Sequence, residues 1–142
     1  MSDASVSMLG MAQLFSLLTW LAQPPPPGVH WKFVVSSVPF TRNWRDAPGT
    51  MDTWSGYVHE RNIILRHMWK ASAEQSVGIV VLSGDRHEFA ATAMSPPRDS
   101  GWPSQATVHE FSCSPLNMFY LPIRTYVQDD PEDVCLKYSE FI

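Results

Sequence analysis

The sequence predicts an α/β fold with a mixed sheet and flanking helices. Residues 77–83 form a continuous apolar run, which is typical of a strand buried on both faces. A strand-like run at residues 31–38 and a helical pattern at residues 57–75 precede it, in the order of a βαβ unit. The 142 residues have room for one domain with one core.

The first predicted element is a helix at residues 8–22. Apolar side chains recur there at the spacing of one helical face, at Met11, Leu14, Phe15, Leu18 and Leu21. We expect this stripe to pack inside the protein. No Lys or Arg precedes the run and no small-residue cleavage site follows it, so a signal peptide is not predicted. The run is also shorter than the roughly 20 residues that span a bilayer, and the compartment is left open.

The remaining elements follow in order. Four prolines at residues 24–27 end the first helix, because proline lacks a backbone N–H and restricts the residue before it. Pro39 ends the first strand. The loop after it carries Arg42, Asn43 and Trp44, and such side chains are found both in functional loops and in packed surface loops, so both interpretations stay open. Residues 89–94 and the alternating run at 107–113 are expected as antiparallel additions to the same sheet.

Charge is distributed unevenly along the chain. Residues 129–142 hold five of the 14 acids and one of the 10 bases, which leaves nine of each in residues 1–128. We therefore expect a neutral body at 1–128 and a loosely attached acidic tail at 129–142. A neutral body has no nucleic-acid binding face, which requires excess Lys and Arg. Charged residues are 17% of the chain against a usual value of about 25%, which predicts that more protein covers part of the surface.

Residues able to do chemistry follow the buried strand, in Ser83-Gly84-Asp85-Arg86-His87-Glu88. Ligands of α/β sheets bind beyond the carboxyl ends of strands, where this segment is expected. In extended backbone Asp85 and His87 would face the same way, about 6–7 Å apart at Cα. A carboxylate and an imidazole at this spacing suit one metal ion or two adjacent ions. A structural salt bridge or a surface turn explains the same residues, and both interpretations stay open.

Other catalytic motifs are excluded by spacing. His59-Glu60 begins like the zinc protease motif H-E-x-x-H, but Ile63 stands where the second His is required. The G-x-S-x-G motif of serine hydrolases, the P-loop and the G-x-G-x-x-G motif do not occur.

Five short blocks occur along the chain in a fixed order: Met8-Leu9-Gly10, Lys32-Phe33-Val34-Val35-Ser36-Ser37-Val38-Pro39-Phe40, Asp52-Thr53-Trp54 with Gly56-Tyr57, Leu82-Ser83-Gly84-Asp85-Arg86-His87-Glu88-Phe89, and Glu110-Phe111-Ser112 with Ser114-Pro115-Leu116. Together they resemble the C-terminal part of PhoD-like phosphatases. The resemblance implies a metallophosphoesterase fold, which is a four-layer αββα sandwich with a metal cluster at the strand ends. It further implies hydrolysis of phosphate mono- or diesters with divalent or mixed metal ions, iron and calcium among them.

The resemblance also implies roles for single residues. Asp85 and His87 match the family's late Gly-Asp-x-His block, whose Asp and His resemble metal ligands. Arg86, between them, would hold phosphate or pair with a carboxylate. Asp52 belongs to a block whose acidic residues reach the metal site. The family's early metal-binding blocks precede the Met8 segment, where this chain has seven residues, so we expect the other ligands from an N-terminal half or a partner chain.

Two functions from different classes follow. The first is a PhoD-like metal-dependent phosphoric ester hydrolase, acting on a phosphate ester, whose activity needs the N-terminal half. The alternative is a non-catalytic fragment or interaction protein that binds a partner through an exposed apolar face.

Overall fold

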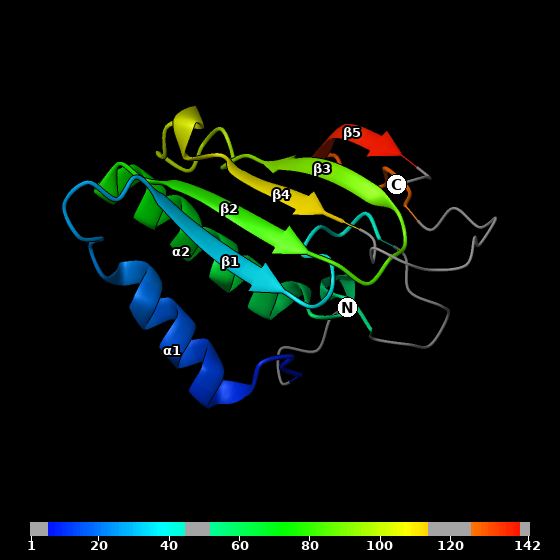
Figure 1. Ribbon diagram of the computed structural model, residues 1–142, viewed down its shortest axis with the longest axis horizontal. Helices are drawn as coiled ribbons and strands as arrows, with labels where there is room; N and C mark the ends of the chain where they lie inside the picture. Colours follow the sequence, from blue (N-terminus) through cyan, green and yellow to red (C-terminus); the bar gives the residue numbers. More distant parts are fainter. Residues whose placement is uncertain (1–5, 45–51, 114–125, 140–142) are drawn as a thin grey trace.

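The chain folds around a five-stranded sheet in the order β1-β2-β4-β3-β5, with α2 behind one face of the sheet and α1 beside it (Figure 1). The computed structural model describes residues 6–44, 52–113 and 126–139. The elements are α1 (Gly10–Ala22), β1 (Trp31–Ser36), the 3₁₀ turn η1 (Trp54–Gly56), α2 (Val58–Gln75), β2 (Gly78–Ser83), β3 (Phe89–Met94), the 3₁₀ turn η2 (Ser104–Ala106), β4 (Val108–Ser112) and β5 (Asp133–Ser139). The predicted α/β class with a mixed sheet is confirmed.

Strand direction follows the prediction for three of the four strands that the sequence predicts, and no strand was predicted at the position of β5. β1 and β2 are parallel, joined through α2, so the predicted βαβ unit is confirmed. β3 runs antiparallel to both β4 and β5. The prediction that residues 107–113 also form an antiparallel addition is wrong with respect to β2, because β4 lies between β2 and β3 and runs parallel to β2. Alternation of apolar and polar residues predicts which side chains face the core, but it carries no information on strand direction.

Helix α1 forms as predicted, but with a different buried face. Leu14, Leu17 and Leu18 pack against the core around the fully buried Leu21, whereas Met11 and Phe15 of the predicted stripe are largely exposed. A helix that is apolar on most sides offers several stripes with the same period, and packing against α2 selects one of them. None of the helices in the described part of the chain combines the length and the apolar character needed to cross a bilayer.

Side chains from distant elements hold both ends of α1. At its start, the Glu60 carboxylate of α2 accepts hydrogen bonds from the backbone N–H groups of Met8 (2.7 Å) and Leu9 (3.2 Å). At its end, the Lys32 ammonium of β1 donates to the carbonyl oxygens of Trp20 (3.2 Å), Leu21 (2.8 Å) and Gln23 (2.6 Å). The first N–H groups and the last carbonyl groups of a helix lack their usual intrahelical partners, so these contacts complete both ends of α1. Burial lowers the pKa of the Lys32 ammonium.

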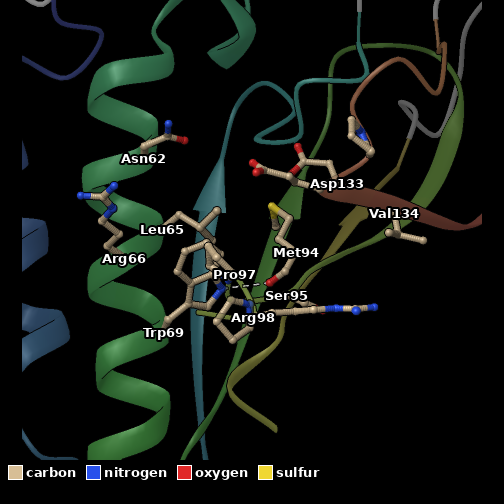
Figure 2. A pocket seen from close by; sticks show the side chains of 13 residues that line it. Asn62, Leu65, Arg66, Trp69, Met94, Ser95, Pro97, Arg98, Asp133 and Val134 are labelled. Carbon is tan, nitrogen blue, oxygen red and sulfur yellow. Dashed lines mark hydrogen bonds between the residues drawn. The ribbon is translucent and has the colours of Figure 1, made fainter. Parts of the chain in front are cut away.

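A cavity of about 560 Å³ lies between α2, the segment after β3 and the beginning of β5 (Figure 2). Trp69 and Leu65 of α2 line one side of it, and the Trp69 indole donates a hydrogen bond to the Met94 carbonyl at 2.9 Å. None of the four residues that the sequence predicts as site residues lines this cavity.

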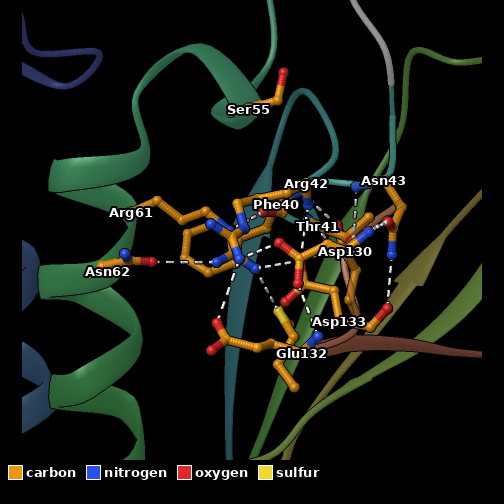
Figure 3. A network of polar contacts seen from close by, with 12 residues as sticks. Phe40, Thr41, Arg42, Asn43, Ser55, Arg61, Asn62, Asp130, Glu132 and Asp133 are labelled. Atoms are coloured by element: carbon orange, nitrogen blue, oxygen red, sulfur yellow. Dashed lines mark hydrogen bonds and ion pairs between the residues drawn. The ribbon is translucent and has the colours of Figure 1, made fainter. Parts of the chain in front are cut away.

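Strand β5 is attached to the rest of the fold by a buried polar network (Figure 3). Asp133, at the first position of β5, is 1% exposed. Its carboxylate accepts hydrogen bonds from the Arg61 guanidinium (2.5 Å), the Thr41 hydroxyl (2.9 Å) and the Arg42 backbone N–H (2.7 Å). The expectation that residues 129–142 are loosely attached is therefore wrong for the described part of that segment. An excess of acids does not keep a segment in solvent when one of the acids meets a buried arginine.

Candidate functional site

The carboxyl ends of the three parallel strands β1, β2 and β4 meet at one edge of the sheet. The Cys113 N–H, just past β4, donates to the Ser83 carbonyl at the end of β2 at 2.8 Å. A Cβ at Gly84 would lie 3.6 Å from the Cys113 carbonyl oxygen and 3.8 Å from the Ser37 carbonyl oxygen, just past β1. The predicted loop therefore begins where the backbones of three strand ends converge. Open α/β sheets bind their ligands at this edge.

The loop between β2 and β3 is not extended, and the prediction that rested on extended backbone is wrong. Asp85 has φ 80° and His87 has φ 60°. Both lie in the left-handed region, which costs a residue with a side chain about 1–2 kcal/mol. The loop must carry the chain from β2 past the position of β4 into β3, so it bends instead of continuing the strand. Strained backbone of this kind clusters at functional sites.

The side chains of this loop differ in their surroundings. Asp85 is exposed, while Arg86 and His87 are half-buried. The Nδ1 atom of His87 is buried and has no hydrogen-bond partner among the described residues. A buried polar atom without a partner costs about 1–3 kcal/mol. An imidazole nitrogen in this state is suited to coordinate a metal ion, and the exposed carboxylate of Asp85 lies two residues before it.

Glu88 fixes the end of the loop. Its carboxylate accepts hydrogen bonds from the Tyr138 hydroxyl of β5 at 2.8 Å and from the Tyr126 N–H at 3.1 Å. Glu88 is 4% exposed, so its side chain turns into the fold while Asp85 faces solvent. Tyr138 of β5 therefore holds the end of the candidate loop in place, and the sequence did not predict this contact.

Asp52 occupies a separate position in the fold. It is exposed and precedes η1, whose first turn is capped by Thr53. Within residues 6–44, 52–113 and 126–139 there is no group of three His, Cys, Asp or Glu side chains close enough to hold one metal ion. The structure thus places Asp85, Arg86 and His87 in one loop and does not bring Asp52 into a ligand cluster with them. As donor types, the His87 nitrogen and the Asp85 carboxylate fit part of a metal coordination sphere.

A buried carboxylate that the sequence analysis missed supports this edge of the sheet. Glu110 of β4 accepts hydrogen bonds from the backbone N–H groups of Phe40 (2.6 Å) and Thr41 (2.7 Å) and from the Ser83 hydroxyl (2.6 Å). Burial raises the pKa of the Glu110 carboxyl, and these hydrogen bonds with the nearby Arg61 only partly offset the effect. The sequence did contain a signal for this residue. The alternation of the strand places Glu110 on its inward face, and a carboxylate at an inward position requires buried partners.

A second cavity, of about 370 Å³, lies near the end of β1. It is lined mainly by apolar residues of α1 and the segment before it, of β1 and the loop after it, and of η1 and α2, with Ser36 and Ser37 at the strand end. Ser37 is also the residue whose carbonyl approaches Gly84. Asp85, Arg86 and His87 line neither this cavity nor the larger one beside α2.

Comparison with known proteins decides the family. Residues 1–140 match the family described as PhoD-like phosphatase. The chain belongs to the PhoD-like phosphatase family. The resemblance carried by the five sequence blocks is confirmed, although Ser114, Pro115 and Leu116 of the last block lie outside the described residues.

Structural comparison agrees with this membership at the level of the fold. A solved structure described as "Structure of PhoD" superposes with a TM-score of 0.57 at 20% sequence identity. The match covers 78% of this PhoD-like chain and 21% of that chain, so this chain spans about a fifth of the length of the structure it matches. No curated protein in the sequence comparison gives a match.

Proposed function

We propose that this chain supplies part of the active site of a metal-dependent phosphoric ester hydrolase. The observation that carries the proposal is the buried, unpartnered Nδ1 atom of His87, in a strained loop at the carboxyl edge of three parallel strands. Membership of the PhoD-like phosphatase family gives this donor a chemical context. Asp85, two residues earlier and exposed, is the second proposed ligand.

In this proposal the residues of the loop have different roles, which are metal binding and phosphate binding. His87 and Asp85 hold metal ions through an imidazole nitrogen and a carboxylate. When bound, such ions polarise a phosphoryl oxygen and generate the nucleophile at neutral pH. Arg86, between the two, presents a guanidinium that matches two phosphate oxygens. Asp52 is a further proposed ligand. In this proposal it binds metal together with groups that lie outside the described residues.

The remaining ligands in this proposal come from another segment, either in a longer polypeptide or in a partner chain. A hydrolytic site needs a fixed coordination number and a dry, shaped cavity, which two ligands do not provide. The small share of the PhoD structure that this chain covers supports this division. We therefore expect the 142-residue chain alone to bind metal weakly and to show no phosphatase turnover above background.

Calorimetric titration with Zn²⁺ tests the ligand assignment, because zinc accepts both imidazole and carboxylate and has no redox chemistry. Weak binding to the chain should be lost in His87→Ala and reduced in Asp85→Asn. His59→Ala, at an exposed position in α2, is the matched control and should bind as the wild type does. Unchanged Zn²⁺ affinity in His87→Ala would overturn the assignment of this residue.

A chromogenic phosphate ester tests whether the chain alone holds a complete site. We expect no hydrolysis above background with added metal. Steady turnover that is abolished both by a chelator and by Asp85→Asn would show that no further segment is needed.

The alternative function, a non-catalytic interaction protein, is favoured by one observation. One face of the sheet carries large apolar side chains that remain exposed, among them Trp31, Phe33 and Val35 of β1. The mass of the native polypeptide on an immunoblot discriminates between the two functions. A species much larger than 16.0 kDa favours the hydrolase, and one at 16.0 kDa favours the interaction protein.

A further inference from the structure

The cavity beside α2 has the size and the walls of a small-molecule site. Its volume of about 560 Å³ lies within the range of about 300–1,000 Å³ that is typical of ligand pockets. One wall is a stripe of α2, whose members recur at the spacing of a single helical face: Asn62, Leu65, Arg66 and Trp69. The other walls come from the segment after β3 and from the beginning of β5. None of the proposed metal ligands contributes to the lining.

The apolar part of the lining is held in a fixed arrangement. Trp69 is 7% exposed, and its indole is fixed by the hydrogen bond to the Met94 carbonyl at 2.9 Å. The Trp69 ring also packs against Trp102, with 5.7 Å between the ring centroids. Pro96 and Pro97 follow β3 with a backbone that the proline rings restrict. Fixed walls lower the cost of ordering on binding, and indole and thioether groups favour a flat aromatic body beside them.

The acidic side chains of the lining already have cationic partners. The Asp133 carboxylate is paired with Arg61 at 2.5 Å, and the Glu132 carboxylate lies 3.3 Å from the Arg42 guanidinium. Neither Arg61 nor Arg42 belongs to the lining. The two acids therefore leave the positive charge of the cavity itself uncompensated.

That charge is carried closest to the cavity by Arg98. Its side chain is exposed, and its guanidinium has neither a hydrogen bond nor an ion pair with the part of the chain that the structure describes. In Figure 2 it extends below Met94 toward Val134, along one wall of the cavity. Arg66, the other arginine of the lining, lies on the side of α2 away from Met94 in the same view.

We propose that this cavity binds a small organic monoanion, an aromatic carboxylate, with its ring against Trp69 and Met94 and its carboxylate on Arg98. A guanidinium offers two parallel N–H groups that match the two oxygens of a carboxylate. A phosphate dianion fits less well, because the carboxylates of Glu132 and Asp133 in the same lining repel a second negative charge. The inference does not rest on the proposed hydrolase function, and its test needs no metal.

An NMR titration of the isotope-labelled chain with naphthoate tests the proposal. We expect signals of the lining residues, with the Trp69 indole N–H among them, to shift with a dissociation constant of about 0.1–1 mM. The neutral analogue naphthyl methanol should bind at least about fivefold more weakly, since it forms no ion pair with Arg98. Unshifted signals of the lining residues, or equal affinity for the two compounds, would overturn the proposal.

Variants of the chain test the role of Arg98. Arg98→Gln should raise the dissociation constant of naphthoate at least about fivefold and leave that of naphthyl methanol unchanged. Val134→Glu, at a 49% exposed position of the lining, adds a carboxylate and should weaken naphthoate binding in the same way. Lys70→Gln removes an exposed cation of α2 outside the lining and should leave both constants unchanged.

Naphthyl phosphate, titrated without metal, separates a carboxylate site from a phosphate site. At the signals of the lining residues we expect weaker binding than for naphthoate. Tighter binding of naphthyl phosphate at these signals would overturn the carboxylate assignment. Equal weakening of naphthoate binding in Arg98→Gln and Lys70→Gln would overturn the role of Arg98, because the attraction would then come from the overall charge of the protein.

Discussion

Arg61 of α2 and Asp133 of β5 form an ion pair in which both side chains are 2% exposed, with 2.5 Å between Nη2 and Oδ2. The Arg61 Nε–H also donates to the Phe40 carbonyl at 2.5 Å. One arginine thus joins the helix, the loop after β1 and the last strand. This loop is also the one that Glu110 ties to the end of β2 at the candidate site.

Removing the charge of Asp133 should strongly destabilise the protein. Asp133→Asn leaves the Arg61 charge buried without its partner, and breaking buried pairs in this way costs about 3–5 kcal/mol. The free energy of unfolding in urea measures the loss. Glu132→Gln, at the neighbouring position where the side chain is 73% exposed, should change it by less than about 0.5 kcal/mol. Similar urea midpoints for the two variants would contradict a structural role for the pair.

Glu110 should give the stability of the protein a specific pH dependence. Because its pKa is raised in the folded state, the folded protein binds a proton more readily than the unfolded chain does. The contribution of Glu110 is therefore full below its ordinary pKa of 4.5 and is lost as pH rises through the raised value. The free energy of unfolding, measured upward from pH 4.5, should fall less steeply in Glu110→Gln than in wild type. In Glu74→Gln, which changes an exposed carboxyl, the wild-type slope should remain.

Lys32 should stabilise the end of α1. Lys32→Met removes three hydrogen bonds from a charged donor. The Leu21 carbonyl keeps its bond from Gln75 and the Trp20 carbonyl its bond from the Gln23 N–H, whereas the Gln23 carbonyl loses the Lys32 ammonium. We expect a loss of about 2 kcal/mol in the free energy of unfolding, with faster amide hydrogen exchange in α1. Lys70→Met, at an exposed position of α2, should have little effect on either measurement. Unchanged exchange in α1 would show that the helix end does not depend on Lys32.

The strained backbone at His87 should make glycine the more stable replacement there. At φ 60° alanine pays the cost of the left-handed region and glycine does not, so His87→Gly should exceed His87→Ala in stability by about 1 kcal/mol. In strand β4 the order should reverse, and His109→Ala should be the more stable of the pair by about 0.5–1 kcal/mol. Thermal denaturation of the four variants measures both differences. A preference for alanine at position 87 would argue against stored strain in the loop.

Much of the fold was predictable from local patterns. The βαβ unit was predicted because residues 77–83 are apolar throughout and the proline run separates the first helix from β1. The candidate site was predicted to the level of a loop, since Asp85 to His87 follow a buried strand. The backbone of that loop was not predicted, because its left-handed residues are imposed by the crossing from β2 to β3 and not by glycine.

The sequence by itself determined which segments form helices and strands, since hydrophobic period and proline placement act over a few residues. It also determined membership of the PhoD-like phosphatase family, through five short blocks and the match over residues 1–140. Only the tertiary structure decided that β4 runs parallel to β2, that Asp133 is buried against Arg61, and that the His87 ring nitrogen is left without a partner. Each of these depends on contacts between residues far apart in the chain, and short-range patterns carry no record of such contacts.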